Sequence, residues 1–214
     1  MLTYCCWIWG LITAGLAVVL QVCEYCSIDV WLIGCCAGDV NNGERMMKIY
    51  IVGIVAGGKT TLAKELSRRL ATPWYELDCI VHVNSDKGRY KRTPEEQVEL
   101  INSIDKAGRW IIEGTYRKSC HCLMDMADTI IFLDPPLGIR KLRIIKRFIK
   151  QQLGLEKCHY KSDIGMLKLM FKWTREFESD RRNFEGLLQP YNNKVLRLQD
   201  NKDLSFLRGI NRQV

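Results

Sequence analysis

The sequence has no pair of C-x-x-C motifs at the spacing of a zinc ribbon, although it contains ten cysteines. Six of these lie within the first 46 residues, and the other four are scattered along the rest of the chain. A structural zinc site draws its ligands from such paired motifs, so the sequence gives no reason to expect one. We expect the cysteines to be free thiols.

Charged residues are almost missing from residues 1–46. No charged side chain occurs from Met1 to Cys23, and Arg45 is the only basic residue of the segment. A secretory signal has basic residues ahead of its apolar core, so we do not expect export. The uncharged stretch is long enough to cross a bilayer, and the positive-inside rule would then place the basic remainder of the chain inside.

Another interpretation is that residues 1–46 are not part of the native protein. Met46 and Met47 stand one residue before the first predicted strand, as a true start would. Three interpretations therefore stay open: a non-native extension, a membrane anchor, or a segment with a buried or other role.

Internal repeats and long low-complexity linkers are absent from residues 47–214. This part carries 31 Lys and Arg against 20 Asp and Glu, a formal charge of +11. Its length suits one α/β domain with a sizeable core. We predict a boundary near residues 41–43, with an apolar, cysteine-rich extension over 1–46 and one domain over 47–214.

Residues 53–60 read G-I-V-A-G-G-K-T and match the phosphate-binding pattern G-x-x-x-x-G-K-[ST]. An apolar run precedes them and a helical pattern follows, which is the strand-loop-helix context that the motif requires. Backbone N–H groups of such a loop converge on phosphates, and the helix N-terminus favours the anion. The residues predicted to bind a nucleoside triphosphate are Gly53, Ala56, Gly57, Gly58, Lys59, Thr60 and Thr61.

Two side chains of this loop have distinct predicted roles. Lys59 is expected to reach the β- and γ-phosphates of ATP, and Thr60 to offer its hydroxyl group to Mg²⁺. ATP and Mg²⁺ are therefore the predicted cofactors. Because the domain needs access to ATP, we predict a cytoplasmic location, with membrane anchoring as the alternative if residues 1–46 are native.

Apolar runs alternate with helical patterns along residues 47–214. The predicted strands cover 49–52, 74–78, 110–113, 129–134 and 194–198, and the predicted helices run from 59 to 71, from 94 onwards and from 137 to 153. This alternation is typical of a parallel sheet with helices on both faces, a three-layer α/β fold.

Three of the predicted strands end in an acidic residue: Asp78, Glu113 and Asp134. Open parallel sheets bind ligands at the carboxyl ends of their strands, so we expect these acids near the phosphates. Glu113 is suited to hold Mg²⁺ through water, and Asp78 to orient or deprotonate an acceptor hydroxyl. Asp134 either faces the phosphates as well or caps the turn before Pro135.

The predicted helix over 137–153 is strongly basic, with aliphatic residues at helical spacing. It is a solvated face, an arginine-bearing lid over a nucleotide, or a contact with nucleic acid or membrane. We favour the lid, because phosphoryl transfer depends on positioning and charge neutralisation and arginine binds phosphate through paired hydrogen bonds. Arg140, Arg143 and Arg147 are then candidate catalytic residues, and the mixed apolar and basic stretch 171–182 would form the other side of the cleft.

Several motifs occur together and in order: K-I-Y-I-V-G (48–53), G-K-T-T-L-A (58–63), Y-E-L-D (75–78), W-I-I-E-G-T-Y-R (110–117) and D-T-I-I-F-L-D (128–134). With these motifs, residues 47 to about 207 resemble the adenylate-kinase-related P-loop proteins described as DNA topology modulation, or FlaR-like, proteins. The resemblance implies a P-loop NTPase fold of the nucleotide-kinase type, with a five-stranded parallel sheet in the order 2-3-1-4-5.

The resemblance also implies a role for Arg117. In the wider nucleotide-kinase group, the arginine of a D-G-[FY]-P-R pattern holds the acceptor phosphate, and E-G-T-Y-R at 113–117 is similar. The sequence departs from that pattern where Glu113 replaces the aspartate and Tyr116 replaces the proline. These departures leave the acceptor open.

Two functions remain. The first is a phosphotransferase, monomeric or homodimeric, that moves the γ-phosphoryl group of ATP to a small acceptor such as a nucleotide or nucleoside. The second is an ATP-binding regulator or ATPase that acts on nucleic acid, which the charge of +11 and the family description favour. A kinase needs Arg117 and the arginines from 140 to 147 in one cleft, whereas a DNA-binding protein needs them on an open surface. We favour the kinase.

Overall fold

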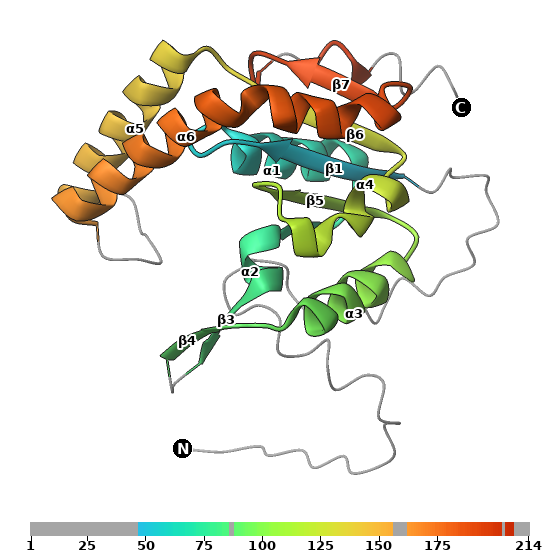
Figure 1. The fold of residues 1–214 in the computed structure, drawn as a ribbon. Helices are drawn as coiled ribbons and strands as arrows, with labels where there is room; N and C mark the ends of the chain where they lie inside the picture. Colours follow the sequence, from blue (N-terminus) through green and yellow to red (C-terminus); the bar gives the residue numbers. More distant parts are fainter. Residues whose placement is uncertain (1–46, 86–87, 156–161, 203, 208–214) are drawn as a thin grey trace, which may run out of the picture. The chain divides into compact units, whose positions relative to one another are not determined.

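The computed structural model describes residues 47–85, 88–155, 162–202 and 204–207 (Figure 1). All of them belong to one compact unit of the chain, Val40–Val214. The interpretations of residues 1–46 lie outside the described residues. None of the helices in the described ranges combines the length and the apolar composition that crossing a bilayer requires.

The strands are β1 (Lys48–Gly53), β2 (Trp74–Glu76), β3 (His82–Ser85), β4 (Gly88–Lys91), β5 (Trp110–Gly114), β6 (Thr129–Leu133) and β7 (Val195–Leu198). The helices are α1 (Lys59–Leu70), α2 (Leu77–Val81), α3 (Pro94–Asp105), α4 (Cys122–Met126), α5 (Leu137–Gln152) and α6 (Ile164–Leu188), with short 3-10 turns η3 (Lys118–Cys120) and η4 (Gln189–Tyr191).

Five strands form one parallel sheet in the order β2-β5-β1-β6-β7. When only these strands are counted along the chain, the order is 2-3-1-4-5, which confirms the predicted topology. β1 lies at the centre and pairs with β5 on one side and β6 on the other. Its residues from Ile49 to Gly53 are buried, as a central strand covered on both faces requires.

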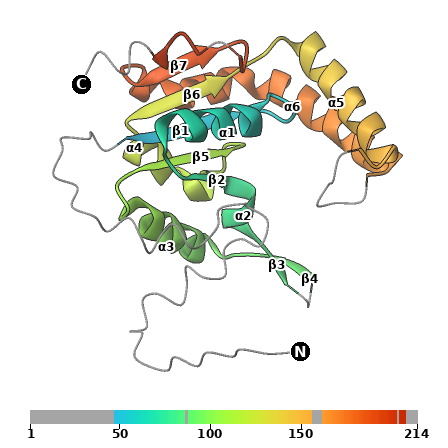
Figure 2. The same ribbon diagram turned by 180° about the vertical axis from the view of Figure 1, so that it is seen from behind.

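Helices cover both faces of the sheet (Figures 1 and 2). α1 lies on one face, where Leu62 and Leu66 share a hydrophobic cluster with Ile49 of β1. α6 lies on the other face, where the ring of Phe184 packs edge-on against Phe132 of β6 at a centroid distance of 5.2 Å. The predicted three-layer α/β architecture is confirmed.

Several elements differ from the prediction, and the helices α4 and α6 are absent from the predicted ones. The second strand ends at Glu76 instead of Asp78, because Leu77, Ile80 and Val81 are fully buried at helical spacing and form the short helix α2. The antiparallel hairpin of β3 and β4 is absent from the predicted elements. β4 is exposed along its whole length and has no alternation of apolar and polar residues that would reveal a strand.

Candidate functional site

The loop 54–58 joins the carboxyl end of β1 to α1, at the sheet edge where parallel folds bind ligands. Ala56 and Gly58 adopt positive φ angles of 56° and 96°. A Cβ at Gly58 would lie 2.9 Å from the side chain of Asn201, and a Cβ at Gly53 would lie 2.5 Å from the carbonyl oxygen of Leu133. The glycines at both ends of the motif are therefore required by close contacts of the loop.

The first turn of α1 carries the two side chains predicted to act on phosphate and Mg²⁺. Lys59 Nζ donates a hydrogen bond to the carbonyl oxygen of Ile54 at 2.9 Å, so its ammonium group lies over the loop. Thr60 Oγ1 donates to Glu113 Oε1 at 2.5 Å. The structure thus brings the start of α1 and the end of β5 together at the loop.

Lys59 and Glu113 both occupy an environment that disfavours their charged forms. Burial raises the pKa of the Glu113 carboxyl group, against the opposing effects of Lys59 and of the hydrogen bond from Thr60. Burial also lowers the pKa of Lys59, which the charges of Glu113 and Asp78 partly offset. Paired groups with perturbed pKa values at the edge of a sheet are typical of functional sites.

Glu76 is a further acid of this site and is not among the predicted site residues. It ends β2 and stands opposite Glu113 in the register of β2 and β5. Its charge contributes to the raised pKa of Glu113. The signal that identifies it is an acid at a strand end, two residues before Asp78.

Asp78 and Arg117 form an ion pair, with 2.6 Å between Arg117 Nη2 and Asp78 Oδ1. Asp78 lies in α2 after β2, and Arg117 follows β5, so the adjacency of the two strands brings them together. Their side chains are 62% and 31% exposed. An arginine and a carboxylate that solvent can reach are able to bind an anionic group and a hydroxyl group of one small molecule.

Two of the three arginines predicted for a lid lie at the phosphate-binding loop. Arg143 Nη1 donates to the carbonyl oxygen of Gly57 at 2.6 Å, and its Nη2 donates to Asn201 Oδ1 at 2.8 Å. Arg147 is close enough to Lys59 for its charge to lower the pKa of that lysine. Asn201 is absent from the predicted site, although it follows the last strand at the same edge of the sheet, which is a usable signal.

Arg140 does not lie at the loop. Its guanidinium group is buried, donates to the carbonyl oxygen of Pro135 at 3.0 Å and to Glu178 of α6, and lies over the ring of Phe177. The prediction that Arg140 contacts the nucleotide is therefore wrong. The physical reason is its place on α5, one turn before the fully buried Ile144 and on the same inner side of the helix.

Asp134 has neither of the two roles left open for it. It accepts two hydrogen bonds from Arg181, at 2.8 and 3.1 Å, and two from Arg197, at 3.1 and 2.5 Å. Against the effect of burial, these hydrogen bonds lower the pKa of Asp134. Arg181, in the stretch expected to form the other side of the cleft, is thus bound to the end of β6.

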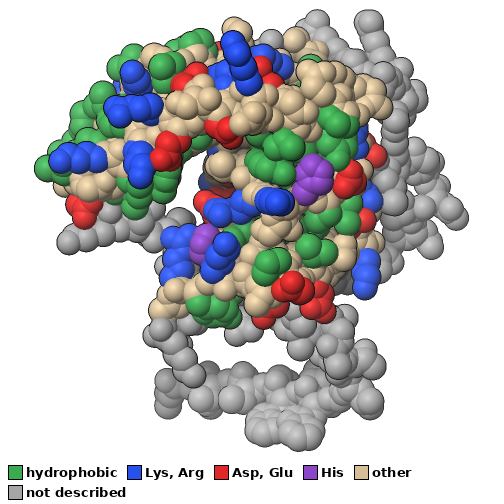
Figure 3. All heavy atoms as spheres, in the orientation of Figure 1, with side chains coloured by type: hydrophobic (Ala, Val, Ile, Leu, Met, Phe, Trp, Pro, Cys, Tyr) green, Lys and Arg blue, Asp and Glu red, His purple; other side chains and the backbone are tan. Residues whose placement is uncertain are grey.

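The site lies beside a hollow in the molecular surface. Figure 3 shows the surface hollowed between the part formed by α5 and α6 and the part formed by α2, β3 and β4, with basic side chains on both sides. Basic walls around a phosphate-binding loop suit an anionic ligand.

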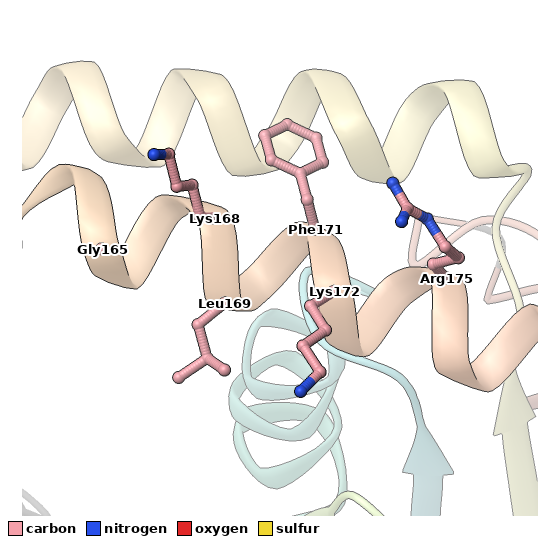
Figure 4. Close-up of a pocket in the computed structure, with 6 residues that line it drawn as sticks. All are labelled: Gly165, Lys168, Leu169, Phe171, Lys172 and Arg175. Carbon is pink, nitrogen blue, oxygen red and sulfur yellow. The ribbon is translucent and has the colours of Figure 1, made fainter.

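A second concavity lies along the N-terminal half of α6 (Figure 4). The residues that line it are Gly165, Lys168, Leu169, Phe171, Lys172 and Arg175. Figure 4 shows Lys168, Phe171 and Arg175 pointing toward α5, whereas Leu169 and Lys172 point to the opposite side. Polar groups of a ligand site converge on one point, and these side chains diverge, so we assign no ligand to it.

Among the described residues, no cluster of three or more His, Cys, Asp or Glu side chains is arranged to hold a metal ion. The thiols of Cys120 and Cys122 are free. Mg²⁺ needs fewer protein ligands, because it keeps several waters and binds substrate phosphates. The hard oxygen atoms of Thr60 and Glu113 fit that requirement.

Comparison with known proteins bears on the fold. No family model matches the sequence. A shikimate kinase of Clostridium botulinum (strain Okra / Type B1) is 26% identical over 142 residues, which cover 59% of this chain and 79% of that protein. The shikimate kinase of strain Kyoto / Type A2 is 25% identical over the same shares.

Among solved structures, shikimate kinase from Acinetobacter baumannii in complex with shikimate matches with a TM-score of 0.51 and 13% identity, over 79% of this chain and 96% of that one. The chain has a P-loop kinase fold. None of these similarities extends to DNA topology modulation proteins, so that part of the resemblance stays a prediction.

Proposed function

We propose that this chain is an ATP-dependent kinase that transfers the γ-phosphoryl group to a hydroxyl group of a small anionic acceptor. The observation that carries the proposal is the ion pair of Asp78 and Arg117 beside Glu113, which in turn binds Thr60 of the phosphate-binding loop. A donor site and an acceptor site therefore share one edge of the sheet.

The donor half of the proposed reaction belongs to the loop and α1. Backbone N–H groups of the loop and Lys59 would bind the phosphates of ATP. Thr60 would hold Mg²⁺ directly and Glu113 through water, and the ion would neutralise charge on the β- and γ-phosphates. Arg143 and Arg147 would add positive charge on the side of α5.

The acceptor half belongs to the ends of β2 and β5. Arg117 would bind the anionic group of the acceptor, and Asp78 would orient its hydroxyl group. Asp78 takes the hydroxyl proton as the new O–P bond forms and the bond between the γ-phosphorus and the bridging oxygen of ADP breaks. The similarity to shikimate kinases supports a small acceptor of this chemistry, because shikimate carries a carboxylate and hydroxyl groups.

A role on nucleic acid gains no support from the arginines of the described part of the chain. Arg140 is buried, Arg143 is bound to the loop, and Arg117 is paired with Asp78. These positions do not form the open basic surface that a duplex requires.

The test is ADP formation from MgATP with a panel of small hydroxy acids, nucleosides and nucleotides. We expect one group of acceptors to stimulate turnover. Lys59→Ala should lower the rate by roughly 10² to 10³, as loss of one preorganised charge does, without lowering the melting temperature. Lys64→Ala, on the same helix but exposed, is the matched control.

The acceptor side has its own arm of the experiment. Arg117→Ala should raise the KM of the acceptor and leave ATP affinity nearly unchanged, and Arg117→Lys should not restore it, since an ammonium group cannot make two parallel hydrogen bonds. The neighbouring Lys118→Ala should behave like the unaltered protein. Weaker ATP binding with an unchanged acceptor KM would place Arg117 on the donor side, and undiminished turnover in Lys59→Ala would refute the proposal.

A further inference from the structure

The outer side of α5 is apolar although it is exposed. Leu142, Ile145 and Ile149 are 61%, 43% and 50% exposed, and Ile139 and Leu153 extend the same row toward both ends of the helix. We call these five residues the outer stripe. The proposed kinase site uses none of them, and a contiguous exposed apolar patch is typical of an interaction surface.

The outer stripe points away from the site and from α6. The inner side of α5 carries the fully buried Ile144 and Arg140, which binds Glu178 of α6. At about 100° per residue, Leu142 and Ile149 lie about 140° to 160° around the helix from Ile144, and about 100° or more from Arg143. Movement of α5 toward the phosphate-binding loop would therefore leave the stripe uncovered.

The charge of α5 restricts what the stripe can bind. The helix carries six basic residues, Arg140, Lys141, Arg143, Lys146, Arg147 and Lys150, and no acidic one. Figure 3 shows hydrophobic and basic side chains interleaved along the outer edge of this part of the molecule. On the neighbouring α6, acidic residues begin only at Glu176, and Glu176 and Glu178 already contact basic partners.

A second copy of the chain is a poor partner for this surface, because it would bring its exposed lysines, Lys141, Lys146 and Lys150, against the same three lysines of the first copy. An anionic lipid bilayer suits both the apolar and the basic residues of this surface. Its acyl chains accept the aliphatic side chains, and its headgroups attract the lysines. Lys146 and Lys150 are exposed beside the stripe and can extend to the headgroup level.

We propose that the outer stripe of α5 docks the protein on an anionic membrane surface. The helix lies in the plane of the interface, with Leu142 and Ile149 inserted among the acyl chains and Lys146 and Lys150 on anionic headgroups. This role is separate from phosphoryl transfer.

The test is sedimentation of the full chain with phosphatidylcholine vesicles, with and without phosphatidylglycerol. We expect binding to the anionic vesicles, weakened about tenfold or more in the variant carrying Leu142→Ser and Ile149→Ser. The exposed Leu187→Ser on α6 is the matched apolar control and should bind normally. Residues 1–46 are present in every protein compared, so their contribution cancels.

A second variant separates the electrostatic contribution. Lys146→Gln with Lys150→Gln should weaken binding to anionic vesicles and make it less sensitive to salt. Equal binding of both double variants and the unaltered chain would overturn the proposal, as would equal binding to neutral and anionic vesicles. Self-association that Leu142→Ser with Ile149→Ser abolishes would assign the stripe to a second copy and also overturn it. Every measurement in this test is of vesicle binding or self-association and none is of kinase activity. The membrane proposal can therefore be judged even if the kinase proposal fails.

Discussion

At the level of single residues, Ala56 has a strained backbone conformation at the centre of the phosphate-binding loop. Its φ of 56° lies in the left-handed region, where a Cβ costs about 1–2 kcal/mol. Ala56→Gly removes that cost. Glycine also gives the unfolded chain more conformational freedom, which offsets about 0.5–1 kcal/mol of the gain in stability. We expect a net stabilisation of up to about 1 kcal/mol, or about 2–4 °C in Tm.

A thermal melt measures this change, and Ala71→Gly is its matched control. Ala71, at the end of α1, has a φ of 46° and lies outside the loop. Both variants should melt at a higher temperature. A lower Tm for Ala56→Gly alone would mean that the methyl group of Ala56 contributes packing that outweighs its strain.

The stability of the protein depends on pH through Glu113, and the burial of this residue determines the direction of the dependence. Its pKa is raised in the folded state, so between the unfolded and the folded pKa the folded chain holds a proton that the unfolded chain has lost. Stability contributed by this group is therefore fully present below the unfolded pKa, is lost as pH rises through the folded pKa, and stays lost above it. Glu113→Gln should be more stable than the unaltered chain at neutral pH, by a margin that shrinks in acid.

Urea denaturation over a series of pH values measures that margin, with the exposed Glu99→Gln as control. The same Glu113→Gln variant should lose Mg²⁺-dependent turnover, because an amide cannot replace the carboxylate charge. A variant that is destabilised equally at all pH values would show that Glu113 acts mainly as a hydrogen-bond acceptor for Thr60.

At the level of elements, α5 and α6 are joined by a partly buried ionic cluster. Arg140 binds Glu178, which also accepts hydrogen bonds from Arg181, and Arg181 binds Asp134 at the end of β6. Arg140→Ala should cost about 3 kcal/mol or more, because it leaves Glu178 partly unpaired and Phe177 uncovered. Arg140→Met also leaves Glu178 without this partner but keeps an aliphatic side chain over Phe177, so it should cost less than Arg140→Ala.

Urea denaturation of the two variants tests this difference, and the KM for ATP provides the second measurement. Arg140→Met should keep a nearly normal KM, whereas Arg143→Ala should raise it, since Arg143 contacts the loop. If Arg140→Met has normal stability but has lost turnover, Arg140 acts on the nucleotide as first predicted.

The burial pattern of α5 shows which features of this helix its sequence can predict. Aliphatic residues lie on both sides of this helix, as the buried Ile144 and the exposed Leu142 show. Periodicity therefore predicts the helix but does not show which of its sides is buried. For the same reason it does not show that Arg140 is buried whereas Arg143 lies at the loop. The same limit applies to β3 and β4, whose exposed residues carry no pattern.

Other parts were predictable because their determinants are contiguous. The loop, Lys59 and Thr60 follow from one motif, and the start of α3 follows from Thr93, which forms a capping box with Glu96. Contacts between distant residues were not predictable in this way. The end of the last strand places Asn201 at the ligand-binding edge of the sheet, but its contact with Arg143 depends on how β7 pairs with β6, which no local pattern encodes.

For the whole molecule, the extent of the domain over residues 47–214 stays a prediction. Trp110 of β5 donates a backbone hydrogen bond to the carbonyl oxygen of Met47 at 3.2 Å, and β1 begins at Lys48. We predict that a chain starting at Met47 folds and binds MgATP as tightly as the full chain. Circular dichroism and ATP titration of both proteins measure this, and folding of the full chain alone would move residues 1–46 into the domain.

The central place of β1 has a consequence for synthesis on the ribosome. β1 emerges first, but Lys48 pairs with Trp110, which is added about 60 residues and about 3–12 s later at ordinary translation rates. Its other neighbour, β6, follows later still. For that interval the nascent chain presents Ile49, Ile51 and Val52 without the strands that later cover their backbone. We expect a holding chaperone to bind β1 of the nascent chain during that interval.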